Sequence, residues 1–266
     1  MFRHWPPFLH NLRMSWGAIF FNRLRIQCMV FSIEHQLELP DDFPAQDMVA
    51  FMAAARTVTL SPRISLAWIQ LGGASNLIGW RFRSCHEDMS TYIESWKRFG
   101  SHVSFEEIYL REKALFGMFT AGVSCIETAC YALYALASHP KLLALPFGEN
   151  EQRNCTPTSL QKQLAKRLEA KALAVCLELL VHSKEWQQWV ALRNRMSHRS
   201  NLPRHIRGAV GSKPPPAKIL EFAATTSTPA FIGDHHDLRN LFTWLSGSLR
   251  NLLIEGRSFA TSLSVN

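Results

Sequence analysis

The stretch from Ala114 to Pro140 constrains the fold more than any other, because Glu127 is its only formally charged side chain. A helix this long and this apolar must bury most of its surface, either in lipid or against other helices. Thr, Ser, Tyr and Gly residues interrupt the apolar run, and no second span accompanies it. We therefore predict a central core helix, beginning near Ser104 to Glu107, rather than a membrane span.

Further segments combine apolar residues at helical spacing with helix-start or helix-stop signals. Thr156-Pro157 is typical of a helix start, and Pro203 ends any continuation of the helix before it. These segments are Asp47 to Arg56, Glu87 to Phe99, Thr156 to about His182, Glu185 to His198, and Asp234 to Ile254.

Breaks between these helices are predicted from glycine, proline and polar residues. The apolar segment Leu66 to Trp80 carries Gly72-Gly73 and Gly79, so we expect its helix to be interrupted or to end early. We expect a loop at Leu142 to Cys155, and another at residues 204–229 with one short extended piece at Ile219 to Phe222.

Together these patterns predict an all-α protein, a helical bundle with an additional N-terminal helical region. We expect residues 1–44 to be a poorly ordered or ancillary extension and residues 45–100 to be helices that pack on the bundle. Residues 101–266 are expected to form the main helical domain, which is long enough to bury a substantial core.

Composition excludes several classes of protein. Arg13, Arg23 and Arg25 interrupt the apolar runs that a secretory signal would need. The six cysteines contain no C-x-x-C pair and no regular spacing, so we expect no disulfide framework and no zinc site. Phosphate-binding, dinucleotide-binding and serine-hydrolase motifs are absent from the sequence. We therefore expect a cytoplasmic protein without a metal or cofactor.

Positive charge gathers between Trp186 and Leu220, a stretch with seven basic residues and no Asp or Glu. Such a stretch is a reasonable footprint for the phosphates of RNA, because each contact releases condensed counterions. The alternative is a solvated loop kept soluble by its arginines. As candidate RNA contacts we name Arg195, Arg199, Arg204 and Arg207.

The sequence Arg193-Asn194-x-x-x-His198 lies within this stretch, at the end of a predicted helix. A guanidinium can stabilise charge on a phosphate, and an imidazole can move a proton near neutral pH. Arg193 and His198 diverge by about 140° on a regular helix. For both to meet one phosphate, the helix must end or unwind near His198, or two copies must face each other in a dimer.

The long, nearly uncharged helix around Glu127, followed by a second helix and the Trp-rich Arg193 to His198 segment, resembles the all-helical HEPN domain. The resemblance covers roughly Glu106 to Pro203. It implies a HEPN-type bundle, frequent homodimerisation, and metal-independent cleavage of RNA by its own 2′-OH. It also implies that Arg193 and His198 are the catalytic pair, with Asn194 and Glu127 in support. A neutralising antitoxin-type partner is a further expectation.

A second interpretation is a non-catalytic helical binding or dimerisation module, since the family also includes members that do not cleave. In that case His198 caps its helix and Arg193 satisfies Glu127 in the core. Two other clusters rank lower as chemical sites. His235-His236-Asp237 is better explained as a helix start than as a metal site, and Cys85-His86 lacks a third group for nucleophilic catalysis.

Overall fold

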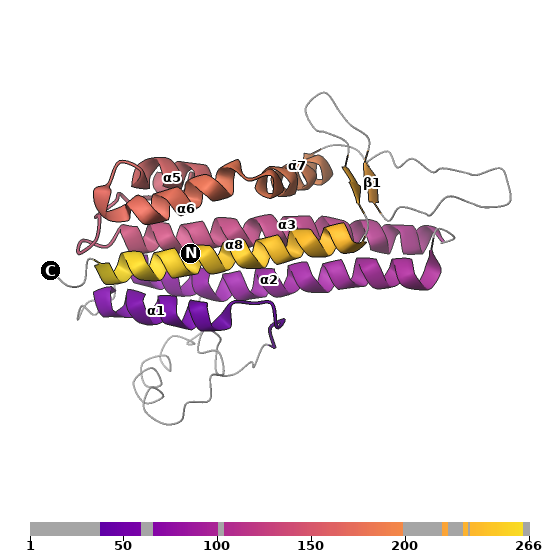
Figure 1. Ribbon diagram of the computed structural model, residues 1–266, viewed down its shortest axis with the longest axis horizontal. Coiled ribbons are helices and arrows are strands. Elements are labelled where there is room, and N and C mark those ends of the chain that lie inside the picture. Colours follow the sequence, from indigo (N-terminus) through magenta and orange to yellow (C-terminus); the bar gives the residue numbers. More distant parts are fainter. Residues whose placement is uncertain are drawn as a thin grey trace, which may run out of the picture.

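The computed structural model describes residues 38–59, 66–100, 104–198, 220–222, 231–233 and 235–262. These residues form an all-α helical bundle with one small β-hairpin, as Figure 1 shows. The α-helices are α1 (Ala45–Thr59), α2 (Leu66–Phe99), α3 (Phe105–Ala137), α4 (Glu149–Arg153), α5 (Pro157–Leu164), α6 (Lys171–His182), α7 (Lys184–His198) and α8 (His235–Ser262). A 3-10 turn, η2 (Leu168–Ala170), and the strands β1 (Leu220–Phe222) and β2 (Phe231–Gly233) complete the described elements.

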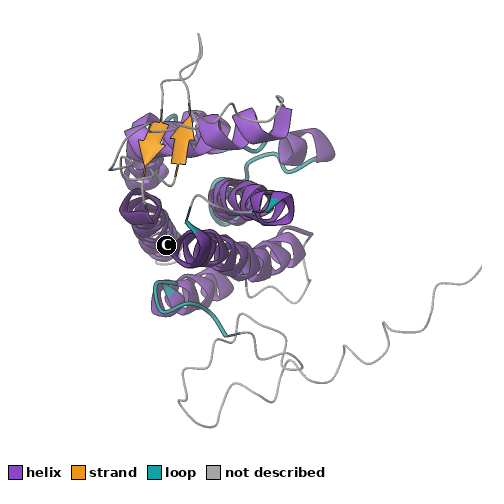
Figure 2. Ribbon diagram, turned by 90° about the vertical axis from the view of Figure 1, so that its right-hand side faces the viewer, coloured by secondary structure: helices purple, strands orange, loops and turns teal. Residues whose placement is uncertain are grey.

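Two long helices, α2 and α3, lie side by side through the middle of the molecule, and α8 runs along them (Figures 1 and 2). Helix α1 packs on α8 at one side of this group, while α5, α6 and α7 cover another. The core between the layers is continuous, and among its largest fully buried side chains are Phe51, Phe82, Phe119, Trp189 and Phe242.

Helix α3 is the central helix that the apolar run predicts. Ser104 caps its N-terminus by accepting a hydrogen bond from the backbone N–H of Glu107 at 3.2 Å. Of the described helices, α3 alone is long and apolar enough to cross a membrane, and most of its apolar window is buried against other helices. Such burial is typical of the core helix of a soluble protein.

Helix α2 is continuous, so the predicted interruption at Gly72-Gly73 and Gly79 is wrong. A glycine costs a helix about 1 kcal/mol relative to alanine. Packing outweighs this cost, because α2 lies against α3 along its length and buries Ile78 and Phe82 completely.

A buried arginine of α3 holds the C-terminal end of α2. Arg111 donates hydrogen bonds to the side chain and the carbonyl oxygen of Ser95, at 2.6 and 2.9 Å, and to the carbonyl oxygen of Gly100 at 2.8 Å. Its guanidinium carbon lies 4.4 Å from the centre of the Trp96 ring. Gly100 ends α2 with a φ of +56°, a conformation that favours glycine.

The region from Leu142 to His182 differs from its prediction in two ways. The expected loop contains the short helix α4, and the helix expected from Thr156 to His182 is divided into α5, η2 and α6. A capping box between Thr156 and Ser159 starts α5, as the Thr-Pro sequence predicts. Because the helix is broken after α5, Leu164 of α5 and Leu173 of α6 both reach the core. A single straight helix would not necessarily bury both side chains.

The short extended piece expected at Ile219 to Phe222 is confirmed by β1, which pairs antiparallel with β2 through Leu220 opposite Gly233 and Phe222 opposite Phe231. The sequence also predicts a short break at Ser183-Lys184, between the helix that ends near His182 and the one that begins at Glu185. The break is confirmed at Ser183, while Lys184 is already the first residue of α7. Ser183 has an extended backbone between α6 and α7, and its hydroxyl accepts a hydrogen bond from the backbone N–H of Trp186 at 3.1 Å.

Candidate functional site

Helix α7, which carries the Arg-Asn-x-x-x-His motif, is held against α3 by Trp189. The side chain of Trp189 is 0 % exposed and lies edge-on to Phe119, with ring centres 5.0 Å apart. Gly122 of α3 makes room for it, since a Cβ at Gly122 would lie 2.5 Å from the Cζ3 atom of Trp189. Because this contact allows no side chain at position 122, it fixes the distance between the two helices.

One helical turn beyond Trp189, Arg193 faces Glu127 of α3. Nη2 of Arg193 lies 3.6 Å from Oε1 of Glu127, and the two side chains are 27 % and 33 % exposed. The carboxylate that stands alone in the apolar run therefore has a cationic partner from α7, as a buried or half-buried charge requires. Both groups remain partly open to water.

The Arg193 guanidinium is only partly satisfied by this contact. Its Nε–H is buried, and among the described residues no acceptor lies within hydrogen-bonding reach of it. A buried donor without an acceptor costs about 1–3 kcal/mol. The part of the guanidinium that stays open to water can donate hydrogen bonds to an anionic ligand, whereas the buried Nε–H is out of the reach of a ligand from solvent.

The other residues of the motif occupy different environments. Asn194 is exposed, and His198 is the last residue of α7, four positions further along the same helix. A spacing of four places Asn194 and His198 on nearly the same helix face. The side chain of His198 lies outside the described residues.

The structure describes only one of the four arginines predicted to contact RNA. Arg195 is 5 % exposed, which argues against a direct contact between its guanidinium and RNA in the chain as folded. The sequence pattern does not predict this burial. Arg193 and Arg195 face different directions on the helix, and the pattern does not say which direction another helix covers. Arg199, Arg204 and Arg207 lie outside the described residues.

Thiols near Glu127 are kept protonated by burial. Burial raises the pKa of Cys155 to about 12, and the negative charge of Glu127 adds to this effect. The pKa of Cys130 is also raised well above its ordinary value, by burial first and then by Cys155, Cys176 and Glu127. Neither thiol is therefore a nucleophile at neutral pH, since the thiolate is the reactive form.

The lower-ranked clusters gain no support from their surroundings. Cys85 is 0 % exposed, and burial raises its pKa well above the ordinary value, so it does not act as a nucleophile. His236 and Asp237 are exposed in the first turn of α8. Within the described ranges, no group of three or more His, Cys, Asp or Glu side chains is placed to hold a metal ion.

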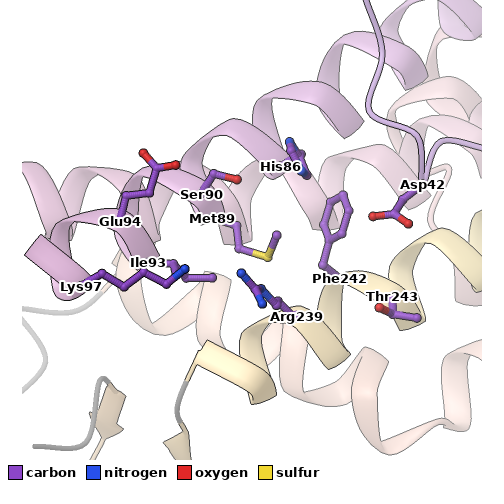
Figure 3. A pocket seen from close by; sticks show the side chains of 10 residues that line it. All are labelled: Asp42, His86, Met89, Ser90, Ile93, Glu94, Lys97, Arg239, Phe242 and Thr243. Carbon is purple, nitrogen blue, oxygen red and sulfur yellow. The ribbon is translucent and has the colours of Figure 1, made fainter.

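A cleft between α2 and α8 was not predicted. It has a volume of about 240 Å³, and Figure 3 shows the ten side chains that line it. Of these, only His86 belongs to a cluster that the sequence singles out. The others come from three separate segments whose proximity no local pattern indicates: Asp42, Met89, Ser90, Ile93, Glu94, Lys97, Arg239, Phe242 and Thr243.

Comparison with known proteins adds no relative from which a function could be transferred. No known protein family, curated protein or solved structure matches this chain significantly.

Proposed function

We propose that this protein is a metal-independent endoribonuclease of the HEPN type. The 2′-OH of a ribose attacks the neighbouring phosphorus, and the bond to the 5′ oxygen of the next nucleotide breaks. Arg193 stabilises the charge that develops on the phosphate, and His198 moves the proton. Asn194 orients the imidazole or a phosphate oxygen. The products are a 2′,3′-cyclic phosphate and a free 5′-OH, so this step consumes no water, and the proposed mechanism assigns no role to a metal.

The observation that carries the proposal is the position of Arg193. Glu127 holds its guanidinium from one side, at 3.6 Å, while about a quarter of the side chain stays open to water. The contact with Glu127 is long for an ion pair, and the N–H groups on the open side of the guanidinium face water. An arginine that is positioned yet incompletely paired can bind a phosphate without first breaking a strong ion pair.

A dimer would complete the proposed site. Arg193 and His198 point about 140° apart on a regular helix, so one phosphate reaches both only if the chain turns after His198 or a second copy supplies one of them. We propose a homodimer in which the two motifs face each other. Arg199, Arg204 and Arg207 would contact the flanking phosphates of the RNA.

Metal independence and the product ends test the proposal directly. The purified full-length protein should cleave mixed single-stranded and folded RNAs in excess EDTA, and the upstream fragments should carry a 2′,3′-cyclic phosphate. A substrate in which 2′-deoxyribose replaces the ribose at the cleaved position should stay intact, because it lacks the nucleophile. Failure to cut any of a diverse set of RNAs would refute the proposal.

The setting of this activity is part of the same proposal. We propose a cytoplasmic enzyme, where a reducing environment keeps the thiols of Cys85, Cys125 and Cys130 free, as they are in the structure. An active ribonuclease endangers the RNA of its own cell. A neutralising antitoxin-type partner that covers the Arg193 side of α7 would control it.

The second candidate function is a non-catalytic binding or dimerisation module, which is favoured by the burial of Arg195 and by the pairing of Arg193 with Glu127. Under this interpretation Glu127→Ala lowers the free energy of unfolding by about 1 kcal/mol, because the half-buried guanidinium of Arg193 loses its anionic partner. Chemical denaturation of wild type and variant measures the difference. Glu149→Ala is the control, since Glu149 pairs with Arg153 in full contact with solvent. Equal stability of wild type and Glu127→Ala would remove the main support for a purely structural pair.

A further inference from the structure

Helix α6, in the layer that it forms with α5 and α7 (Figure 1), presents apolar side chains to solvent as well as to the core. Its inner face packs against α5 and α8 and buries Leu173, Leu177 and Leu180. On its outer face Val175 is 45 % exposed and Leu179 is 71 % exposed. A helix that is apolar on opposite faces is normally covered on both of them. The outer face of α6 is therefore a candidate contact surface.

The exposed apolar side chains of α6 form a row. Ala172, Val175 and Leu179 are all exposed, and they are three and four residues apart, which places them along one side of the helix. Leu168, which is 87 % exposed, lies in the turn η2 directly before α6. Single exposed leucines are common on protein surfaces, but a row with this spacing is the seam against which a second helix packs.

Lys171 and Glu178 are the only formally charged residues of α6, and both lie on the same side of this row. They are exposed and seven residues apart, and within the described part of the chain neither forms a salt bridge. Their order is also the reverse of what the dipole of their own helix favours, because the cation is the first residue of α6 and the carboxylate is near its C-terminal end. Neither charge is therefore compensated within one chain.

A second copy of the chain compensates both charges if the two α6 helices run antiparallel. In such a two-fold pair the charged side of one seam faces the charged side of the other in reverse order, so Lys171 of each copy meets Glu178 of the partner subunit. Each charge then also lies near the helix end of opposite sign in the partner. A parallel pair would instead place the charged side against the side of Cys176 and leave all four charges unpaired. The outer face of α6 is thus complementary to itself in one orientation only.

We propose that two copies of this chain associate through antiparallel α6 helices, with Val175 of each copy near the two-fold axis. Because α7 follows α6 directly, this arrangement leaves the two α7 helices at opposite ends of the contact. The contact therefore differs from the pairing of the Arg193 to His198 motifs and does not depend on RNA cleavage. A helix of 12 residues is smaller than the roughly 20–30 residues that each partner gives to a stable interface. We expect a weak contact, with a dissociation constant in the micromolar range.

Sedimentation of the full-length protein at concentrations from about 1 to 300 μM tests the proposal. At the highest concentration the mean mass of Leu179→Asp should fall towards half that of the wild type, because the substitution removes an apolar side chain from both sides of the contact and places a charge there. Halving is expected whether or not the copies also pair through Arg193 and His198. The fold should tolerate the change, since Leu179 is mostly exposed.

Reversing the charges tests the orientation of the pair. Lys171→Glu and Glu178→Lys should each weaken association by about tenfold, because the two-fold axis repeats every repulsive contact. The double variant Lys171→Glu/Glu178→Lys restores opposite charges across the contact, and its dissociation constant should return to within about threefold of the wild-type value. Both reversals suit the dipole of α6, so they should not weaken the fold.

Ile69→Asp is the matched control, because Ile69 is an apolar residue of α2 that is 58 % exposed. It should associate as the wild type does. Equal masses of wild type and Leu179→Asp over the whole concentration range would overturn the proposal. A double variant that associates as weakly as the single reversals would overturn the antiparallel pairing. Thermal unfolding of each variant establishes that a loss of association is not a loss of fold.

Discussion

Replacing His198 with alanine should lower the rate of RNA cleavage by about 100-fold or more and leave the fold intact, because general acid–base catalysis contributes roughly 10²–10⁴-fold. Arg193→Ala should cost a similar factor, since the guanidinium would no longer stabilise the charge on the phosphate. Initial rates on one labelled RNA in EDTA measure both effects. Arg193→Lys should recover only part of the rate, because an ammonium lacks the planar fork of donors.

Matched controls separate chemistry from a general loss of positive charge. His182 is the last residue of α6, as His198 is of α7, and it is exposed, while Arg167 is an exposed arginine outside the motif. His182→Ala and Arg167→Ala should cleave at the wild-type rate. If His198→Ala cleaves as fast as His182→Ala, then His198 is not catalytic and the proposed mechanism is wrong.

Mixing the two inactive variants tests whether the site is shared between copies. If Arg193 of one copy acts with His198 of the other, a heterodimer of Arg193→Ala and His198→Ala contains one intact site. Random exchange of subunits should then restore about a quarter of the wild-type activity. If each site is built within one chain, no activity returns. Either outcome leaves the assignment of the two residues intact, and it decides only how they meet.

Helix positions could be predicted from the sequence where local signals and burial agree. Ser104 and Thr156 cap their helices as expected, since a cap depends only on neighbouring residues. The continuity of α2 through Gly72-Gly73 could not be predicted, because it depends on the packing of α2 against α3. The division of α5 from α6 could not be predicted for the same reason, because it depends on which leucines pack in the core.

The candidate site was predictable only in its local part. The Arg193 to His198 motif is continuous in the sequence, and the lone charge of Glu127 in an apolar helix already indicates that a partner is needed. In contrast, three features depend on contacts between helices far apart in the chain: the burial of Arg195, the close contact of Gly122 with Trp189, and the α2–α8 cleft. Helical periodicity says which residues share a face, but not which helix covers that face.

The second large effect, on stability, is expected at Gly122, where the absence of a side chain makes room for Trp189. Gly122→Ala should lower the free energy of unfolding by about 2 kcal/mol, because the new methyl group would overlap the ring of Trp189, and overpacking a core costs about 1–3 kcal/mol or more. Trp189 is fully buried between α3 and α7 and packs edge-on against Phe119, so it has no free space to move into. For a chain of this size the midpoint of thermal unfolding should fall by roughly 4–8 °C.

Two further variants identify the cause of that loss. Gly247 also lies inside a helix, α8, but an added Cβ there meets no atom within 4 Å. Gly247→Ala should therefore leave stability unchanged or raise it by up to about 1 kcal/mol, through helix propensity alone. The double variant Gly122→Ala/Trp189→Leu should be at least about 1 kcal/mol more stable than the sum of the single effects predicts, because the smaller side chain removes the overlap. Additive effects would mean that the two residues do not meet. In that case α7 would not be held at the distance from α3 that brings Arg193 to Glu127.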